Sequence, residues 1–414
     1  MNLFRMAWRY LWGRKLVTIL TLTGIALGSA LICSVLTLHR ESESGLLHES
    51  SQFDMIVGAK GSPLQIVLSS VYHLDIPTGN IPYSRYEALL KDRRVASAIP
   101  IGLGDNYRGF RIVGTDPRLF ELKDHYDNSR LLLHVGSGRL FQDDFETVIG
   151  STVARQTGLK LGDTFVGTHG VAVTAGSSEH TNFPYKVVGI LADSGTSTDN
   201  AVYTTLPSVW RIHDDESAIH ARMAGADVNP NQDREVTAVL VRLRVIGLRF
   251  MMVPEIQKKT ESMAAVPVEE MLRLYKQLLE PMQNVLLAVA GLVVIVSALS
   301  ITATLYQSAE RRRRDLAVMR ALGAHPTEIF TLVVMEGLLL TLLGLAAGWL
   351  LGHGGLAVAS PYLRDSFGVS MAAWTTDPIE WKAFGTVAGC GVLAGLLPAI
   401  LAYRREPVND LSAP

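Results

Sequence analysis

The chain has 414 residues, a net charge of −1 at pH 7 and a mean hydropathy of +0.23. Charged residues make up 19% of it, below the roughly 25% that is usual for soluble domains. The near-neutral charge argues against a nucleic-acid-binding protein, which would carry a basic surface.

Residues 1–15 are basic and amphipathic. Trp8 and Trp12 lie four residues apart, while Arg5 and Arg9 share another helical face. This pattern predicts a helix in the lipid headgroup layer. The alternative is that these residues extend the first membrane span.

Four apolar runs predict transmembrane helices. They cover residues 16–38, 285–306, 329–351 and 383–402. Each has about 20 residues or more, enough to cross a hydrocarbon core of roughly 30 Å. Arginine and lysine concentrate in residues 1–15, in the 307–328 loop and in the 403–414 tail. The positive-inside rule therefore predicts cytoplasmic termini, a cytoplasmic 307–328 loop and an external 39–280 region.

The 39–280 region is too long for a loop and predicts an α+β domain. Helices are expected at Tyr83–Lys91 and Ser151–Thr157, and a turn at Gly104–Asn106. Strands are expected at Asp54–Val57, Val95–Leu103, Phe110–Gly114, Thr147–Gly150, Tyr185–Leu191, Val202–Thr205 and Val236–Arg244. This order suggests two subdomains, one inserted into the other.

A stalk helix is predicted over residues 268–284, continuous with the second span. Met271, Tyr275, Leu278, Met282 and Val285 follow a 4-3-4-3 spacing, which indicates a short heptad seam. Pro281 is expected to kink this helix.

Three features of the spans point to packing or function. Glycines recur at four-residue spacing, which favours close helix approach, at Gly24/Gly28, Gly344/Gly348/Gly352, Gly385/Gly389 and Gly391/Gly395. Cys33 and Cys390 fall in spans and are expected to pack as small apolar residues. Glu336 lies inside the third span, where an ionisable group is a functional candidate; a structural hydrogen bond or a snorkel to the inner interface is the alternative.

No catalytic motif is present. The chain lacks G-x-x-x-x-G-K-[ST], G-x-S-x-G and H-E-x-x-H, so we expect a non-catalytic protein with no cofactor of its own. Histidines are frequent in the 39–280 region, and His169 and His180 are weak candidates for a zinc site. Scattered surface histidines are the competing interpretation.

The segment Glu310–Ala324, ERRRRDLAVMRALGA, resembles the motif after span two in FtsX/MacB-type ABC transporter permeases, the type VII or mechanotransmission family. Glu336-Gly337 and the stretch from Pro398 to Pro407 are similar to further positions of that family. The 39–280 region resembles the MacB-like periplasmic core at Leu140-Phe141, Val148–Gly150, Gly162-Asp163, Val187–Ile190 and Gly195-Thr196. Gly58–Pro63 and Pro77–Asn80 have no such counterpart and suggest a distinct subfamily.

The resemblance implies four transmembrane helices and a periplasmic domain in the bacterial inner membrane. That domain would divide into a porter subdomain (about 45–130 and 222–267) and a sabre-like insert (about 131–221). MacB carries its own ATPase, whereas this sequence starts 15 residues before its first span, so the resemblance implies a separate ABC ATPase subunit holding ATP and Mg. The 307–328 loop would dock on that subunit. The implied coupling residues are Arg311, Arg312, Arg313, Arg314, Leu316, Met319, Arg320, Leu322 and Gly323.

The leading interpretation is a dimeric permease, homomeric or heteromeric, that uses ATP hydrolysis by its partner to move the periplasmic domain for export or extraction of a substrate. A periplasmic adaptor or substrate protein is a further possible partner. Lipoprotein release, regulation of a periplasmic partner without transport, and a metal-linked (zinc) system are the alternatives.

Overall fold

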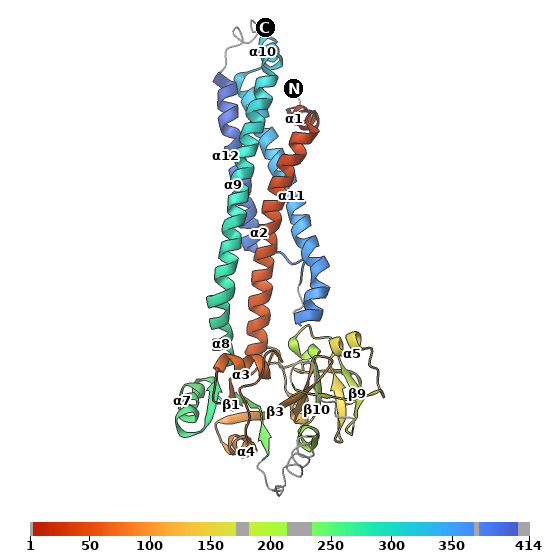
Figure 1. The fold of residues 1–414 in the computed structure, drawn as a ribbon. Helices are drawn as coiled ribbons and strands as arrows, with labels where there is room; N and C mark the ends of the chain where they lie inside the picture. The colour runs from red at the N-terminus through yellow and green to blue at the C-terminus, as the bar shows by residue number, and fades with distance from the viewer. Residues whose placement is uncertain (1–2, 171–181, 213–233, 368–371, 405–414) are drawn as a thin grey trace. The chain divides into compact units, whose positions relative to one another are not determined.

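The computed structural model describes residues 3–170, 182–212, 234–367 and 372–404. The chain forms two compact units (Figure 1). The helical unit comprises Met1–Glu41, Gln277–Pro361 and Met371–Pro414, and the sheet unit comprises Ser42–Lys276 and Tyr362–Ser370. Each unit is described by itself.

The helical unit is built from long apolar helices (Figure 1). Its helices are α1 (Leu3–Trp12), α2 (Lys15–Ser50), α9 (Glu280–Arg311), α10 (Arg313–Ala321), α11 (Pro326–Phe367) and α12 (Pro378–Arg404). Four segments of the described chain are long and apolar enough to cross a membrane: Lys15–Ser50, Pro267–Arg311, Pro326–Arg364 and Pro378–Arg404. The predicted class, four membrane helices with an α+β domain, is confirmed. The helices extend past the predicted spans because a hydropathy window marks only the part of a helix that faces lipid.

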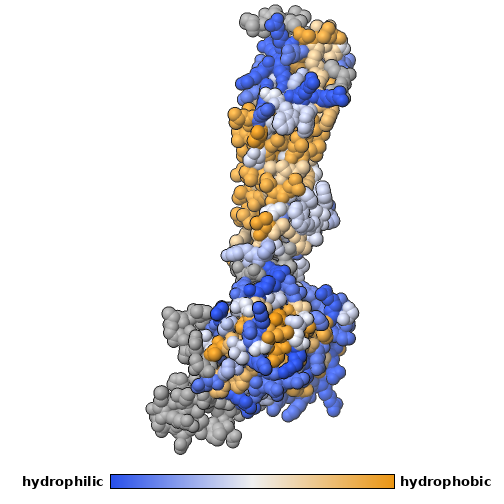
Figure 2. Space-filling view, turned by 90° about the vertical axis from the view of Figure 1, so that its right-hand side faces the viewer, coloured by the Kyte–Doolittle hydropathy of each residue, from blue (hydrophilic) through white to orange (hydrophobic). Residues whose placement is uncertain are grey.

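The surface of the helical unit carries its apolar side chains outward. Figure 2 shows a hydrophobic band along it. Apolar side chains such as Leu20, Leu299 and Leu393 have well over half of their surface exposed. Helices satisfy their own backbone hydrogen bonds, so such a surface is stable in lipid and would be costly in water.

The N-terminal helix α1 is separate from α2. The chain turns at Gly13, where the amide donates to the Arg9 carbonyl at 3.1 Å, and α2 starts at Lys15. Trp8 and Trp12 are exposed with ring centroids 6.3 Å apart, while Ala7 and Leu11 are buried on another face. The alternative that residues 1–15 simply extend the first span is therefore wrong.

The glycine stripe of α11 packs directly against α2. A Cβ added at Gly344 would lie 2.6 Å from the Ile25 side chain, one at Gly348 would lie 1.9 Å from Ser29 Oγ, and one at Gly352 would lie 2.9 Å from Cys33 Cβ. Ile25, Ser29 and Cys33 are themselves four residues apart. The two helices thus meet along two matched rows, as the four-residue spacing predicted for this set. The same prediction is wrong for Gly385 and Gly389 within the described chain, where an added Cβ would have no atom within 4 Å.

The predicted stalk helix contains a change of helical pitch. α8 (Pro267–Leu274) is followed by a π-helical turn, Tyr275–Leu279, and then by α9. The irregularity therefore precedes Pro281, which sits in the first turn of α9. A π turn adds a residue and rotates the following face. Met271 and Tyr275 are buried, whereas Leu278, Met282 and Val285 are exposed in the single chain, so only the first half of the seam packs within the chain and its second half stays a prediction.

The sheet unit is organised around one mixed sheet of 11 strands. Its main path runs β13-β1-β12-β3-β4-β10-β6-β9-β5, with β7 on β9 and β8 on β3. β4–β10 and β6–β9 are parallel and the other pairs are antiparallel. The strands are β1 (Met55–Ala59), β3 (Val95–Tyr107), β4 (Phe110–Thr115), β5 (Val135–Gly138), β6 (Glu146–Ile149), β7 (Thr164–Phe165), β8 (Thr168–His169), β9 (Tyr185–Leu191), β10 (Ala201–Thr205), β12 (Ala238–Leu243) and β13 (Ser262–Ala265); β2 (Ile81–Pro82) and β11 (Glu235–Val236) form a separate pair.

Helices cover both faces of this sheet (Figure 1). Successive β1 residues alternate between two cores: Ile56 joins the core that includes α3 (Pro63–Ser70) and α8, whereas Met55 and Val57 join the one that includes α4 (Tyr83–Lys91) and α7 (Arg249–Lys259). This is the period of two that a strand buried on both faces requires. α5 (Ser151–Thr157) follows β6.

The predictions for Tyr83–Lys91, Ser151–Thr157 and Tyr185–Leu191 match the observed elements to the residue. The predicted turn at Gly104–Asn106 is wrong, because β3 continues through it with a register shift between Leu103 and Asp105. The buried Asn106 amide donates to the Gly170 carbonyl at 2.7 Å and accepts from the Gly109 amide at 3.1 Å. Strands from the predicted porter and sabre ranges share one sheet, and the division between them stays a prediction.

Candidate functional site

The segment predicted to couple to an ATPase, called the coupling segment below, is the helix α10 with its two flanking turns. α9 ends where Arg312 leaves helical geometry, and α10 follows at once. α10 stops at Gly323, whose φ of +101° suits glycine, and the Ala324 amide bonds back to the Met319 carbonyl at 3.0 Å. Pro326 opens α11. Glycine and proline thus isolate α10 as a short helix between two spans.

One arginine of the four-arginine run points inward. The Arg312 guanidinium carbon lies 3.6 Å from the centroid of the Tyr10 ring, and its Nη2 donates to the Tyr10 carbonyl at 3.2 Å. Its Nη1 lies 3.9 Å from Glu336 Oε2, and the two side chains are 15% and 8% exposed. Arg14 adds a hydrogen bond to the Ser308 carbonyl at 3.5 Å. Glu336 is therefore held by a cation from the coupling segment, and the cluster ties α1, α9 and α11 together.

The remaining residues of the coupling segment are either packed against the helical unit or exposed on its surface. Leu316 packs on the core of the helical unit, Met319 and Arg320 are partly buried, and Arg313 lies 3.7 Å from Glu310. Arg311 and Arg314 are exposed. Val318 and Leu322 are 44% and 84% exposed. Because they are four residues apart, these two form an outward apolar edge on α10.

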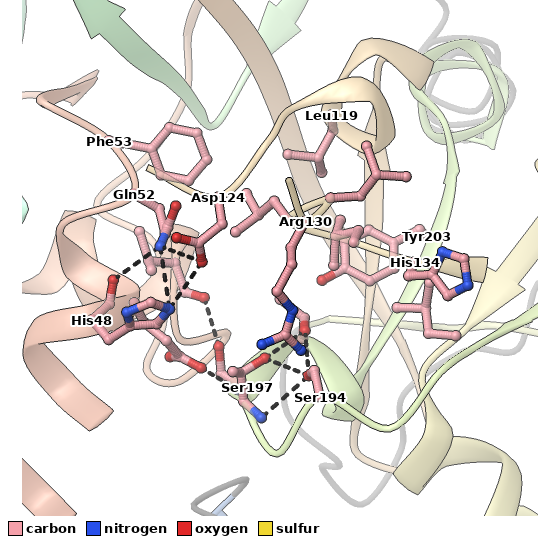
Figure 3. Close-up of a pocket in the computed structure, with 18 of the residues that line it drawn as sticks. His48, Gln52, Phe53, Leu119, Asp124, Arg130, His134, Ser194, Ser197 and Tyr203 are labelled. Atoms are coloured by element: carbon pink, nitrogen blue, oxygen red, sulfur yellow. Dashed lines mark hydrogen bonds and ion pairs between the residues drawn. The ribbon is translucent and has the colours of Figure 1, made fainter. Parts of the chain in front are cut away.

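The sheet unit contains a cavity of about 660 Å³ (Figure 3). The end of α2 supplies His48 and Glu49, and the 129–134 and 191–198 segments supply most of the opposite wall. Its apolar lining includes Phe53, Leu119, Leu133, Leu191 and Leu240, and its polar lining includes Asp124, Arg130, His134, Asp193, Ser194 and Tyr203. A space of mixed polarity suits an amphipathic ligand.

Hydrogen bonds fix one side of the cavity. His48 Nε2 lies 3.0 Å from Asp124 Oδ2, which also accepts from Gln52 Nε2 at 3.1 Å (Figure 3). Burial acts against ionisation of Asp124, but backbone amides of Tyr126 and Asp127 and the His48 ring outweigh it and lower its pKa. The site therefore keeps a carboxylate at neutral pH.

On the other side of the cavity, some buried polar atoms lack a hydrogen-bond partner among the described residues. His73 Nε2 lies 3.2 Å from the Tyr203 hydroxyl, while His73 Nδ1 and Ser70 Oγ have no hydrogen-bond partner among the described residues. Burial raises the pKa of both Tyr203 and Asp199. Burial, with the nearby Arg111 charge, lowers the pKa of His73 from its ordinary 6.5 to about 4.

This shift predicts acid-sensitive stability. Because the folded pKa lies below the unfolded one, the unfolded chain binds the proton first as the pH falls. Stability from neutral His73 is complete above pH 6.5 and declines from pH 6.5 to about 4, by at most roughly 1.4 kcal/mol per pH unit. We expect His73→Asn, which tolerates the φ of +55°, to lose less stability than wild type between pH 7.5 and 4.5 in thermal melts. The exposed His125→Asn is the matched control, and parallel curves for wild type and H73N would contradict the prediction.

Of the two histidines considered for zinc, His169 lies in β8 with its Nδ1 3.7 Å from Asp105 Oδ1. His180 lies outside the described residues. A group of three unlike ligating side chains occurs elsewhere in the described chain, at Cys33, His353 and Glu380. Sequence reasoning missed it because the three residues come from three helices and share no ligand spacing.

Comparison with known proteins agrees with this architecture. Residues 18–265 match the MacB-like periplasmic core domain and residues 287–407 match the FtsX-like permease C-terminal family. The macrolide export ATP-binding/permease protein MacB of Nitrosomonas europaea is 22% identical over 99% of this chain and 59% of its own length. The pyoverdine export ATP-binding/permease protein PvdT of Pseudomonas syringae pv. tomato is 22% identical over 98% and 58%. An uncharacterized ABC transporter permease of Bacillus subtilis, YknZ, is 28% identical over 31% of each chain.

Among solved structures, the periplasmic region of MacB from Actinobacillus actinomycetemcomitans covers 54% of this chain and 92% of its own, at 11% identity and a TM-score of 0.33.

Four spans and a mixed α+β domain of the periplasmic type define a membrane permease subunit. The chain belongs to the FtsX-like permeases with a MacB-like periplasmic core domain, the MacB/FtsX type of ABC transporter permease. It spans about 59% of the length of the curated full-length relatives that it matches.

Proposed function

We propose that this permease couples ATP hydrolysis on a separate ABC ATPase subunit to movement of its sheet unit, and so exports or extracts a substrate. It works as a dimer in the bacterial inner membrane, with both termini and α10 cytoplasmic and the sheet unit periplasmic. ATP and Mg bind the ATPase, and the permease chain itself is non-catalytic.

The coupling segment carries this proposal. Val318 and Leu322 present an apolar edge beside the exposed Arg311 and Arg314. A groove with an apolar floor and an acidic rim would match that edge. On the inner side, Arg312 bonds to Tyr10 and lies within ion-pair distance of Glu336, so a push on α10 reaches α1 and α11 through a buried contact.

The docking test uses one double variant, Val318→Asp/Leu322→Asp. It places two carboxylates on the docking edge without touching the buried Leu316 or Arg312. We expect it to abolish co-purification with the proposed ABC ATPase subunit, and to remove permease-stimulated ATP hydrolysis in nanodiscs. Val245→Asp, an exposed apolar position of the sheet unit, is the matched control and should bind normally. Unchanged ATPase binding by the double variant would refute the docking role.

A second candidate, release of a lipoprotein from the membrane, is supported by the cavity of mixed polarity in the sheet unit. Leu131→Trp would obstruct that cavity at an exposed lining position, and Leu74→Trp, also exposed but outside the lining, is its control. In proteoliposomes with the ATPase, a labelled lipoprotein should be released by wild type and L74W but not by L131W. ATP-dependent activation of a periplasmic partner without release would favour the regulatory alternative instead.

A further inference from the structure

Three metal-ligating side chains meet inside the helical unit. Cys33 of α2, His353 of α11 and Glu380 of α12 are buried, and one ligating atom of each lies within 4.8 Å of the other two. Cys33 Sγ donates to Glu380 Oε1 at 2.8 Å, and His353 Nε2 lies 2.9 Å from the same oxygen. Such polar groups are costly to bury unless they are paired or bind a cation.

The hydrogen bonds of His353 determine which of its ring nitrogens carries the proton. His353 Nδ1 bonds to the backbone carbonyl of Ala373, which can only accept, so Nδ1 carries the proton. In the neutral ring, Nε2 then presents its lone pair to Glu380 Oε1, and a carboxylate oxygen is also an acceptor. The two atoms therefore need a proton or a metal cation between them. A ligating histidine whose other nitrogen donates to a backbone carbonyl is the usual support of a metal centre.

Charge balance also suits a divalent cation. One thiolate and one carboxylate neutralise a 2+ ion, and the imidazole adds a neutral ligand. The site as a whole would carry no net charge, which is what a buried position in a membrane unit requires.

The surrounding structure holds these ligands in place. Gly352 precedes His353, and a Cβ there would lie 2.9 Å from Cys33 Cβ, so glycine is needed to bring α11 this close to α2. The Trp349 ring lies 4.8 Å from the His353 ring, and the Trp374 ring stacks on His353 at 6.0 Å. Two indoles thus limit the rotation of the imidazole and shield the cluster.

We propose that Cys33, His353 and Glu380 bind one divalent transition-metal ion of the zinc type, which ties α2, α11 and α12 together. The mixed sulfur, nitrogen and oxygen set is typical of zinc, with three protein ligands and a fourth position open to water or another donor. Zinc bonds of about 2.0–2.3 Å in a tetrahedron place ligand atoms roughly 3.3–3.7 Å apart. The observed separations of 2.8 and 2.9 Å would open by less than about 1 Å, which side-chain rotation can supply.

The experiment uses the full chain in lipid nanodiscs after treatment with a chelator. Co²⁺ serves as the spectroscopic probe, because a thiolate ligand gives a sulfur-to-cobalt charge-transfer band. Zn²⁺ affinity is then measured by competition with a chromophoric chelator. We expect one equivalent of Co²⁺ with the thiolate band in wild type, and displacement of the band by Zn²⁺. Glu380→Gln and His353→Gln should weaken Zn²⁺ binding by at least roughly 100-fold, the upper end of the loss seen for mere supporting groups.

The two cysteines provide a control in which Cys390→Ala leaves the three proposed ligands intact. The chain has two cysteines, so a thiolate band must come from Cys33 or Cys390. Cys390→Ala should keep the band and Cys33→Ala should lose it. In thermal melts, Zn²⁺ should stabilise wild type and C390A but not E380Q. Binding of less than about a tenth of an equivalent by wild type would show a hydrogen-bonded cluster only, and loss of the band in C390A would place the metal elsewhere; either result overturns the proposal.

Discussion

Replacement of Gly348 with leucine is expected to prevent α11 from packing on α2 and to leave little correctly assembled permease. Even a Cβ at this position would lie 1.9 Å from Ser29 Oγ and 2.6 Å from the backbone oxygen of Ala26. A hydroxyl can rotate away, but a backbone carbonyl in a helix cannot, so the helices must separate. Overpacking a core costs about 1–3 kcal/mol, and we expect at least the upper end of that range here. Size-exclusion profiles and thermal melts of the purified protein measure the loss.

The same helix supplies the control for this prediction. Gly355 lies seven residues further along α11, is exposed, and has no atom within 4 Å of an added Cβ. Gly355→Leu should therefore assemble and melt like wild type. Gly348→Ala combined with Ser29→Ala should recover only part of the stability, because the Ala26 carbonyl remains. If G348L and G355L behaved alike, the two-row contact would play no part in assembly.

Elements with a strong local pattern could be predicted from sequence. The apolar runs predicted the four long helices, and the four-residue glycine spacing predicted a contact face on α11 but not one at Gly385 and Gly389. What the spacing could not give was the partner, because Ile25, Ser29 and Cys33 lie some three hundred residues away in sequence. Turns were harder to predict from the local sequence. Asn106 looks like a turn residue by type, but its side chain bonds to Gly170, a contact that no local pattern reveals.

The coupling segment shows the same limit. Its position between two spans was evident, yet the four arginines are equivalent in sequence and differ in structure. Arg312 turns inward because α9 ends at it, which aims its side chain at Tyr10 and Glu336. Leu316 likewise packs inside, while Leu322 stays outside. Inward and outward side chains are thus divided along one short helix by backbone geometry, which composition does not reveal.

The metal-ligating cluster was missed for a related reason. Histidines are frequent in the polar region, where such residues are common at the surface, so the sequence pattern favours His169 and His180. Cys33, His353 and Glu380 are isolated in sequence, and each sits in an apolar helix. A polar residue that is rare in an apolar helix is a better indicator of a ligand site. Three such residues on three helices should be tested for proximity.

The second large effect is a loss of stability, expected when the Arg312–Glu336 ion pair is broken. Removing one partner of a buried ion pair leaves the other uncompensated, which typically costs about 3–5 kcal/mol. Glu336→Gln should be near the lower end, because Arg312 keeps its contacts with Tyr10. Arg312→Met should cost more, since it removes one of the two cations beside Glu336 and also removes the contact between Arg312 and Tyr10. Free energies of unfolding in nanodiscs, measured by denaturant titration, give both values.

The double variant Arg312→Met/Glu336→Gln distinguishes mutual stabilisation of the two side chains from independent losses of stability at the two positions. If the two groups stabilise each other, the double variant should lose less stability than the sum of the single ones, by at least roughly 1 kcal/mol. Arg314→Met, an exposed neighbour in the same run, is the matched control and should be close to wild type.

Stability alone does not test coupling, so permease-stimulated ATP hydrolysis is measured on the same samples. A network that transmits force from α10 should leave the double variant able to bind the ATPase but unable to stimulate it. Full stimulation by a stable double variant would reduce the pair to an anchor for α1, and strict additivity of the single losses would show that the two side chains act independently.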